Sequence, residues 1–131
     1  MATKYKTYEK YKDSGTEWIE NIPEHWEMRK IGRSFKLISS GTTPASKDDR
    51  NFDNGTINWI NTGDLNDSYL NECNKKITEE SFKSHSLKIY PIGTIIIAMY
   101  GATIGKVSIL NIEGCTNQAC CAINNSKYII N

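Results

Sequence analysis

The chain has 131 residues, a formal net charge of +1 and a hydrophobic fraction of 38%. This length is typical of one domain, and it is sufficient to bury a hydrophobic core without disulfides or metal ions. The nearly balanced charge is not the strongly basic composition of many nucleic-acid-binding proteins, although a local basic face would be enough for binding. No apolar run opens the chain as a signal peptide or reaches the length of a membrane span, so we expect a cytoplasmic protein without a membrane partner.

The cysteines and histidines do not form a metal-binding pattern. No two of the four cysteines have the CxxC spacing of a zinc site, and the two histidines are isolated. We therefore expect free thiols, buried or half-buried, in a reducing compartment. The residues concerned are Cys73, Cys115, Cys120, Cys121, His25 and His85.

The first part of the chain is polar. Residues 1–13 combine lysines, tyrosines and threonines without an apolar face, and we interpret them as an N-terminal arm. Ser14 and Glu17 have the spacing of a helix capping box, which predicts one short helical turn that ends at Pro23. Trp26, Met28 and Lys30 alternate with Glu27 and Arg29, which predicts a short strand. The apolar residues at 31, 35 and 38 have spacings nearer to those of a helix, so this segment is ambiguous.

Loops and short elements follow. We expect a turn after the strand and then a short element that ends at Gly41. Residues 39–55 predict a long loop, and loops of this length are usually functional or disordered. Residues 57–60 predict a short strand, which carries Trp59.

The second half of the chain predicts a helix and a hairpin. Thr78 has the residue type of an N-cap for a helix over residues 79–84, and Phe82 is the expected core anchor of that helix. Residues 94–99 are apolar and β-branched, which predicts a strand buried on both faces. This strand should pair as a hairpin with residues 107–110.

The chain ends on a third strand of the same sheet. Residues 117–123 predict this strand, and residues 127–131 begin a further pattern that the chain does not complete. Strands with one or two short inserted helices indicate an α/β chain of the α+β type.

The turn over residues 101–106, Gly-Ala-Thr-Ile-Gly-Lys, contains the sharpest local motif. A phosphate-binding loop needs four residues between its glycines, a hydroxyl residue after the lysine and a following helix. Here three residues separate Gly101 from Gly105, Val107 follows Lys106, and the next element is a strand. We therefore predict a hairpin or bulge turn with positive φ angles at its glycines, and not a nucleotide site.

The sequence provides no catalytic argument. It contains no GxSxG, HExxH or GxGxxG motif, and the acidic residues of the loops lack the spacing of a metal-binding loop. A cysteine–histidine pair brought together by the fold stays open. Lysine, arginine, asparagine, threonine and tyrosine in the loops can contact phosphates and base edges, or they can be ordinary solvated side chains.

Four segments, taken together, resemble the specificity subunits of type I restriction–modification systems. They agree with that family in order and spacing over about residues 11–123. They are WIENIPEHW (residues 18–26), SSGTTP (39–44), INWINTGDL (57–65), and MYGATIGKV (99–107) followed by TNQA (116–119).

The resemblance implies a target recognition domain, an α/β (α+β) fold with a curved mixed β-sheet, short helices and long loops. Such a domain reads one half of a bipartite target in double-stranded DNA. The complete subunit contains two of these domains separated by long helices, which set the spacing between half-sites and dock the methyltransferase subunits. A separate restriction subunit joins for cleavage, and the specificity subunit directs both kinds of subunit to the site. The resemblance therefore implies a non-catalytic component without a cofactor of its own, since methyl donor, ATP and magnesium belong to the partner subunits.

This interpretation divides the chain into an arm, residues 1–13, and a recognition domain, residues 14–131, without the spacer helix or a second recognition domain. We expect Trp59 to lie in the core and not to stack on a base. The Asn117–Gln118 pair is interpreted as support for the fold. The candidate DNA contacts, selected by loop position and side-chain type, are Lys47, Arg50, Asn61, Thr62, Tyr100, Thr103 and Lys106.

Two other functions remain open at this point. The chain can be a protein-interaction fragment that binds methyltransferase subunits, or another half-subunit, with little DNA affinity alone. An enzyme with an unrecognised site would require a buried polar pocket.

Overall fold

The computed structural model describes residues 6–126. The chain divides into two compact units, Met1–Arg33 and Ser34–Asn131, and each unit is described by itself. The predicted boundary between residues 13 and 14 falls inside a strand of the first unit and stays a prediction. Residues 127–131, which the sequence assigned to an unfinished pattern, lie outside the described residues.

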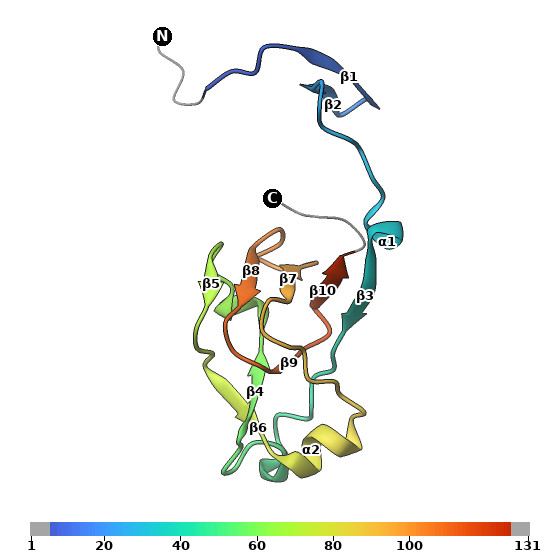
Figure 1. The fold of residues 1–131 in the computed structure, drawn as a ribbon. Coiled ribbons are helices and arrows are strands. Elements are labelled where there is room, and N and C mark those ends of the chain that lie inside the picture. Colours follow the sequence, from blue (N-terminus) through green and yellow to red (C-terminus); the bar gives the residue numbers. More distant parts are fainter. Residues whose placement is uncertain (1–5, 127–131) are drawn as a thin grey trace. The chain divides into compact units, whose positions relative to one another are not determined.

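A β-hairpin is the main regular structure of the first unit. Strand β1 (Tyr11–Thr16) pairs antiparallel with β2 (Ile19–Pro23) (Figure 1). The predicted helical turn at residues 14–17 is therefore wrong. The Ser14 hydroxyl donates across the hairpin to the Ile19 carbonyl and does not cap a helix, and Gly15 has a φ of 80°.

The predicted strand at residues 26–30 is also wrong, because these residues have no regular structure. An alternating pattern forms a strand only where a partner strand is available. The Trp26 ring lies instead 5.8 Å from the ring of Tyr8, and the His25 ring lies 5.4 Å from the same tyrosine. The single-turn helix α1 (Ile31–Ser34) follows and leads into the second unit.

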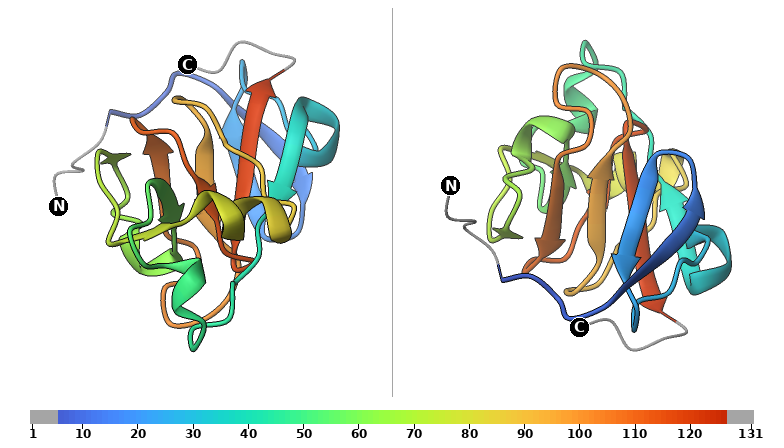
Figure 2. Two further views of the ribbon diagram at one scale, coloured as in Figure 1. Left: turned by 90° about the horizontal axis from the view of Figure 1, so that it is seen from below. Right: turned by 90° about the horizontal axis from the view of Figure 1, so that it is seen from above.

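A mixed five-stranded sheet forms the centre of the second unit, in the order β3-β10-β7-β8-β5. The neighbours pair antiparallel except for β5 and β8, which are parallel. In the two views of Figure 2 successive strands are rotated relative to one another, so the sheet is twisted and curved. The bounds are β3 Phe35–Ser40, β5 Tyr69–Leu70, β7 Ile95–Ala98, β8 Val107–Leu110 and β10 Cys120–Ser126.

The predicted hairpin of β7 and β8 is confirmed, and so is the return of the chain as a third strand. That strand, β10, begins at Cys120, because residues 117–119 form a turn. The prediction that β7 is buried on both faces is wrong. Ile96 and Ala98 are buried, whereas Ile95 and Ile97 are only half-buried. The core thus lies against one face of the sheet.

A smaller three-stranded sheet adjoins it, in the order β6-β4-β9, with β4 and β9 parallel. The helix predicted after Thr78 is confirmed as α2, and the Thr78 hydroxyl caps it by accepting from the Ser81 amide at 3.1 Å. The mixed sheets and few short helices confirm the α+β class. The bounds are β4 Ile57–Ile60, β6 Lys75–Ile77, β9 Cys115–Thr116, α2 Glu79–Ser84, and the 3₁₀ helices η1 Asp49–Asn51 and η2 Thr62–Asp64.

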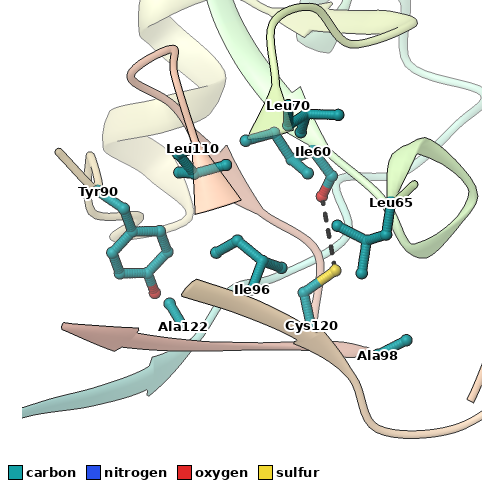
Figure 3. Close-up of a cluster of buried hydrophobic side chains, with 9 residues drawn as sticks. All are labelled: Ile60, Leu65, Leu70, Tyr90, Ile96, Ala98, Leu110, Cys120 and Ala122. Atoms are coloured by element: carbon teal, nitrogen blue, oxygen red, sulfur yellow. Dashed lines mark hydrogen bonds between the residues drawn. The ribbon is translucent and has the colours of Figure 1, made fainter. Parts of the chain in front are cut away.

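Two apolar clusters stabilise the second unit. The larger one lies between the five-stranded sheet and the segment that follows β4 (Figure 3). The thiol of Cys120 approaches the Ile60 carbonyl at 4.0 Å within it. Its members are Ile60, Leu65, Leu70, Tyr90, Ile96, Ala98, Leu110, Cys120 and Ala122.

Trp59 organises the second cluster, with Ile77, Leu87 and Cys115. Its side chain is 3% exposed and its indole nitrogen donates to the Thr42 carbonyl at 3.1 Å. A buried indole needs such a partner, so Trp59 is a core residue as predicted. Phe82 of α2 packs against this cluster, which confirms it as the anchor of that helix.

Candidate nucleic-acid interface

The predicted DNA contacts lie in two separate places of the second unit. Lys47 lies just before η1, and Arg50 lies on it. This 3₁₀ helix contacts α2, at the lower end of the view in Figure 1. The other candidates follow β4 and β7, toward the upper end of the same view. The structure therefore does not gather all the candidates on one surface patch. The second group is Asn61, Thr62, Tyr100, Thr103 and Lys106.

Arg50 is held by a neighbouring carboxylate. Its Nε and Nη2 atoms donate to the two oxygens of Asp48, each at 3.0 Å. These side-chain hydrogen bonds lower the pKa of Asp48 and raise that of Arg50. A guanidinium engaged in this way has to leave Asp48 before it can bind a guanine edge or a phosphate with the same two donors. Lys47 is exposed beside this pair.

The turn between β7 and β8 is closed by a β-bulge. The Ala98 amide donates to the Lys106 carbonyl, and the Gly105 amide donates to the Ala98 carbonyl, both at 2.9 Å. Two residues thus oppose one, and Gly105 adopts a φ of 86° as the first bulge residue. The predicted bulge turn with positive φ at its glycines is confirmed, since Gly101 has a φ of 92°.

This turn presents a mixture of polar and apolar side chains. Tyr100 is 50% exposed, Lys106 is exposed and Thr103 is half-buried. Ile104 is 67% exposed and Met99 is 42% exposed. The predicted contacts in this turn are its polar members, and the exposed Ile104 is not among them. The signal was available, because an isoleucine between two turn residues has no strand face on which to pack.

Asn61 belongs to a hydrogen-bond network beneath this turn. Its Nδ2 donates to the Trp59 carbonyl at 3.1 Å, and its Oδ1 accepts from Asn117 Nδ2 at 3.0 Å. The Met99 amide donates to the Ala119 carbonyl at 2.9 Å, which joins the same network to the β7–β8 turn. The Asn61 side chain is therefore occupied by hydrogen bonds that connect the segment after β4 to the turn before β10. Thr62, half-buried in η2, follows it.

Asn117 has the supporting role predicted for it, whereas Gln118 is exposed. Asn117 accepts from the Ala119 amide at 3.2 Å through its side-chain oxygen. The Gln118 side chain hydrogen-bonds the hydroxyl of Thr43, from the loop after β3. Thr43 and Gln118 thus add an exposed hydroxyl–amide pair beside the turn of residues 117–119.

Two acidic side chains near this surface are committed to backbone amides. Asp64 accepts from the amides of Asn61 at 2.9 Å and Asn74 at 3.1 Å. Asp67 accepts from the amide of Val107 at 3.1 Å. Because these carboxylates accept hydrogen bonds from backbone amides, they help to shape the surface. The turn itself carries one charged side chain, that of Lys106.

The buried thiols belong to the fold and not to a site. Burial raises the pKa of Cys115 and of Cys120 to about 12, so neither is a thiolate near neutral pH. All four cysteines are free thiols and are buried or half-buried, as predicted. Among residues 6–126 no group of three or more histidine, cysteine, aspartate or glutamate side chains is placed to hold a metal ion. Within the same range no helix has the length and apolarity needed to cross a membrane.

Comparison with known proteins identifies the family. The family model of the type I restriction modification DNA specificity domain matches residues 23–131. The chain belongs to this family. The resemblance seen in the sequence is thereby confirmed, including the target recognition domain and its role in recognising DNA within a specificity subunit.

Two curated relatives of this DNA specificity domain are specificity subunits. The chain is 35% identical over 103 residues to the type I restriction enzyme MjaIX specificity subunit of Methanocaldococcus jannaschii, covering 76% of the chain and 23% of that protein. It is 28% identical over 102 residues to the EcoR124I/EcoR124II specificity subunit of Escherichia coli, covering 78% and 24%. The chain thus spans about a quarter of the length of these relatives. The expected non-catalytic role is confirmed by the family and these relatives.

Solved structures show the same fold. A chain from a study of complex assembly and conformational transition of the type I R-M system matches with a TM-score of 0.59 and 18% identity. The HsdS subunit from Thermoanaerobacter tengcongensis matches with a TM-score of 0.58 and 17% identity. Each match covers 91% of this chain and 27% of the other chain. The expected fold, a recognition domain with a curved mixed sheet, is confirmed.

Proposed function

We propose that this specificity domain reads one half of a bipartite target in double-stranded DNA. The observation that supports this most directly is the rigid β7–β8 turn, with exposed Tyr100, Ile104 and Lys106 next to the Asn61–Asn117 network. A two-stranded β-ribbon with such a turn fits the major groove of B-DNA, which is about 12 Å wide.

Phosphate and base contacts have different parts in this proposal. Lys106 binds a phosphate and sets the depth and register of the turn, whereas Tyr100 and Thr103 meet base edges. Lys47 and Arg50 lie at the other end of the unit, so they contact a more distant part of the backbone. Arg50 does so after release from Asp48.

The proposal extends to the assembly. Residues 14–131 form the recognition domain and residues 1–13 an arm, and in a complete specificity subunit the domain directs methyltransferase and restriction subunits to its half-site. Chemistry and cofactors belong to those subunits. The names of the relatives, which are specificity subunits of type I restriction enzymes, support this arrangement.

Titration of the chain against a labelled random-sequence duplex tests the DNA-reading role. At physiological salt we expect dissociation constants on the order of 10⁻⁴ to 10⁻⁶ M, and binding should become much tighter toward about 50 mM. Lys106→Ala should weaken binding to all sequences alike and make the salt dependence shallower by about one unit. Lys36→Ala, at an exposed position of the edge strand β3, is the matched control and should bind as the unmodified chain does. Absence of salt-dependent binding at the lower salt concentration would contradict the proposal.

A protein-interaction role is the second candidate. Three aromatic side chains of the first unit, Tyr11, Trp18 and Trp26, are exposed, and aromatic residues are enriched at protein interfaces. Co-purification with methyltransferase subunits, lost in Trp18→Ala while DNA binding is weak or absent, would favour this function over DNA reading.

A further inference from the structure

The loop that connects β5 to β6 in Figure 1, residues 71–74, carries polar side chains that the fold leaves available. Asn71, Glu72 and Asn74 are exposed. Within the part of the chain that the structure describes, the Glu72 carboxylate and the Asn74 side-chain amide have no hydrogen-bond or ion-pair partner. The side-chain oxygen of Asn71 accepts from Asn111 at 2.9 Å, which leaves its own Nδ2 as a further donor.

The backbone of this loop is nevertheless held in place. Leu70, just before the loop, is 3% exposed in the larger core cluster, and its carbonyl accepts from the Asn111 amide at 2.9 Å. Cys73 packs against the same cluster, and the Asn74 amide donates to Asp64 at 3.1 Å. A loop fixed at both ends loses little backbone entropy when it binds a partner.

The three exposed side chains of the loop line a hollow of about 290 Å³ together with Asp64 and Asn66. Both oxygens of Asp64 accept from backbone amides. The side chain of Asn66 is also engaged, since its nitrogen donates to a carbonyl and its oxygen accepts from an amide and a hydroxyl. The polar groups of this hollow that a ligand can use therefore come from the loop.

The chemistry of these groups limits what they bind in the major groove. A carboxylate only accepts hydrogen bonds, so Glu72 is repelled by phosphates and by the acceptor atoms of guanine and thymine. The donors that the groove offers to it are exocyclic amino groups, N6 of adenine and N4 of cytosine. A side-chain amide pairs with N6 and N7 of adenine, so Asn71 and Asn74 suit the same kind of base edge. Two exposed lysines follow directly, at positions 75 and 76, and supply charges for the flanking phosphates.

The loop also lies where residues that determine one particular target are expected. Domains of one family that read different targets must differ in the residues that make the distinction. The segments by which this chain resembles its family include residues 57–65 and 99–107, and the loop lies between them in the sequence. Contacts made from the shared segments serve every target alike.

Resting on the DNA-reading function proposed above, we infer that the loop of residues 71–74 determines one base of the half-site. Glu72 accepts a hydrogen bond from the exocyclic amino group of an adenine or a cytosine in the major groove, and Asn74 supports the same contact. The carboxylate rejects a base that presents an acceptor there. The loop thus supplies selectivity, whereas the lysines supply affinity without sequence information.

The test begins with selection of duplexes from a randomised library on the 131-residue chain and on its Glu72→Ala variant. At one position of the half-site we expect the unmodified chain to prefer adenine or cytosine by about five-fold or more, the lower end for a specific base contact. Glu72→Ala should have no preference there, and Asn74→Ala a reduced one. Binding of Glu72→Ala to a random-sequence duplex should not weaken, because the variant removes a negative charge that phosphates repel.

Base analogues then distinguish the two bases that carry the amino group. At the selected position, adenine is replaced by unsubstituted purine, or cytosine by pyrimidin-2-one, and each replacement removes only the amino group. The analogue should weaken binding of the unmodified chain about five-fold more than it weakens binding of Glu72→Ala. The comparison between the two proteins cancels the effect of the analogue on the duplex itself.

A matched control separates this contact from the effect of charge. Glu113→Ala removes the same charge from an exposed side chain on the turn after β8, which lines a different hollow. It should retain the full preference of the unmodified chain. The melting temperature of Glu72→Ala should equal that of the unmodified chain, because the side chain is exposed.

Several results would overturn the inference. If Glu72→Ala selects the same half-site as the unmodified chain, or loses affinity for all sequences alike, the loop does not read a base, while DNA reading itself stays intact. An analogue effect of equal size in the two proteins excludes the contact with the amino group. Failure of the library to yield any bound duplex would contradict the DNA-reading function itself.

Discussion

Gly41 lies where two backbone segments approach more closely than any side chain permits. A Cβ atom placed on it would lie 1.6 Å from the carbonyl oxygen of Thr116. The same approach allows the Gly41 amide to donate to the Asn117 carbonyl, and the Thr42 amide to donate to the Thr116 carbonyl, each at 3.2 Å. The glycine thus joins the loop after β3 to the turn that precedes β10.

Gly41→Ala should destabilise the second unit severely, by about 3 kcal/mol. The added methyl group must push the two segments apart and break both backbone hydrogen bonds. Urea unfolding followed by circular dichroism measures the change. Gly63→Ala is the control, because a Cβ at Gly63 meets nothing within 4 Å, and that variant should stay within about 0.5 kcal/mol of the parent. Similar stabilities for the two variants would show that the segments separate easily.

At the scale of single elements, the turn between β7 and β8 depends on its bulge. A Cβ atom placed on Gly105 would meet open space, so the constraint there is the backbone φ of 86°. β-Branched residues reach such angles only with strain, whereas asparagine tolerates them.

Gly105→Val should therefore destabilise the domain by about 1–3 kcal/mol and weaken DNA binding, because the turn loses its shape. Gly105→Asn should lose much less on both counts. Melting temperatures and duplex titrations of the two variants provide the comparison. An unchanged melting temperature for the valine variant would show that the bulge adapts.

The 3₁₀ helix η1 offers a second test at this scale. Asp48→Asn removes the carboxylate charge that holds Arg50 but keeps a side-chain oxygen, which can still accept from the Arg50 amide as Asp48 does at 3.1 Å. If Arg50 binds phosphate, the variant should bind DNA more tightly, with a steeper salt dependence. Asp49→Asn removes a neighbouring negative charge without freeing Arg50. Equal gains in the two variants would mean that only net charge matters.

Elements with strong local signals could be predicted from the sequence. The hairpin of β7 and β8 and the helix after Thr78 depend on β-branched runs, a cap and glycine turns within a few residues. Ser14 shows the limit of such signals. Its capping-box spacing fits a helix and a hairpin equally well, and the hydrogen bond to Ile19 decides for the hairpin.

Pairings between distant segments could not be predicted. β4 lies parallel to β9, and β5 lies parallel to β8, although each pair is separated by a long stretch of chain. For the same reason, no sequence pattern indicated that Asn61 contacts Asn117. Asp48 and Arg50 are only two residues apart, but the conformation of their loop decides whether the two side chains pair. Loop position and residue type identify polar candidates, but only the fold shows which of them are already occupied.

At the scale of the whole molecule, the buried thiols of the three-stranded and five-stranded sheets make the free energy of unfolding decrease as the pH rises into the alkaline range. Burial raises the pKa of Cys115 and Cys120 from 9.0 to about 12. The folded chain therefore keeps both protons when the unfolded chain releases them. This contribution to stability is complete below pH 9 and is lost progressively between pH 9 and 12, by about 1.4 kcal/mol per pH unit and thiol.

Cys120→Ala should accordingly lose stability less steeply above about pH 9 than the unmodified chain. Urea unfolding at intervals from about pH 8 to pH 11 measures the two slopes. Leu70→Ala also truncates the larger core cluster but removes no titrating group, so its slope should match that of the unmodified chain. Parallel curves for all three proteins would place the alkaline transition in other groups.

Asn117 imposes a condition on any exchange of target preference between related domains. Its main-chain amide donates to Ile60 at 3.1 Å, its side chain bonds Asn61 and Ala119, and its carbonyl accepts from Gly41. One residue thus fastens three loops that carry or flank the proposed DNA surface. A chimera that imports the loop after β4 keeps the main-chain bond to residue 60, but it keeps the side-chain bond only where position 61 still accepts from Asn117 Nδ2. Recombination should therefore yield active new specificities only where this asparagine pair is retained.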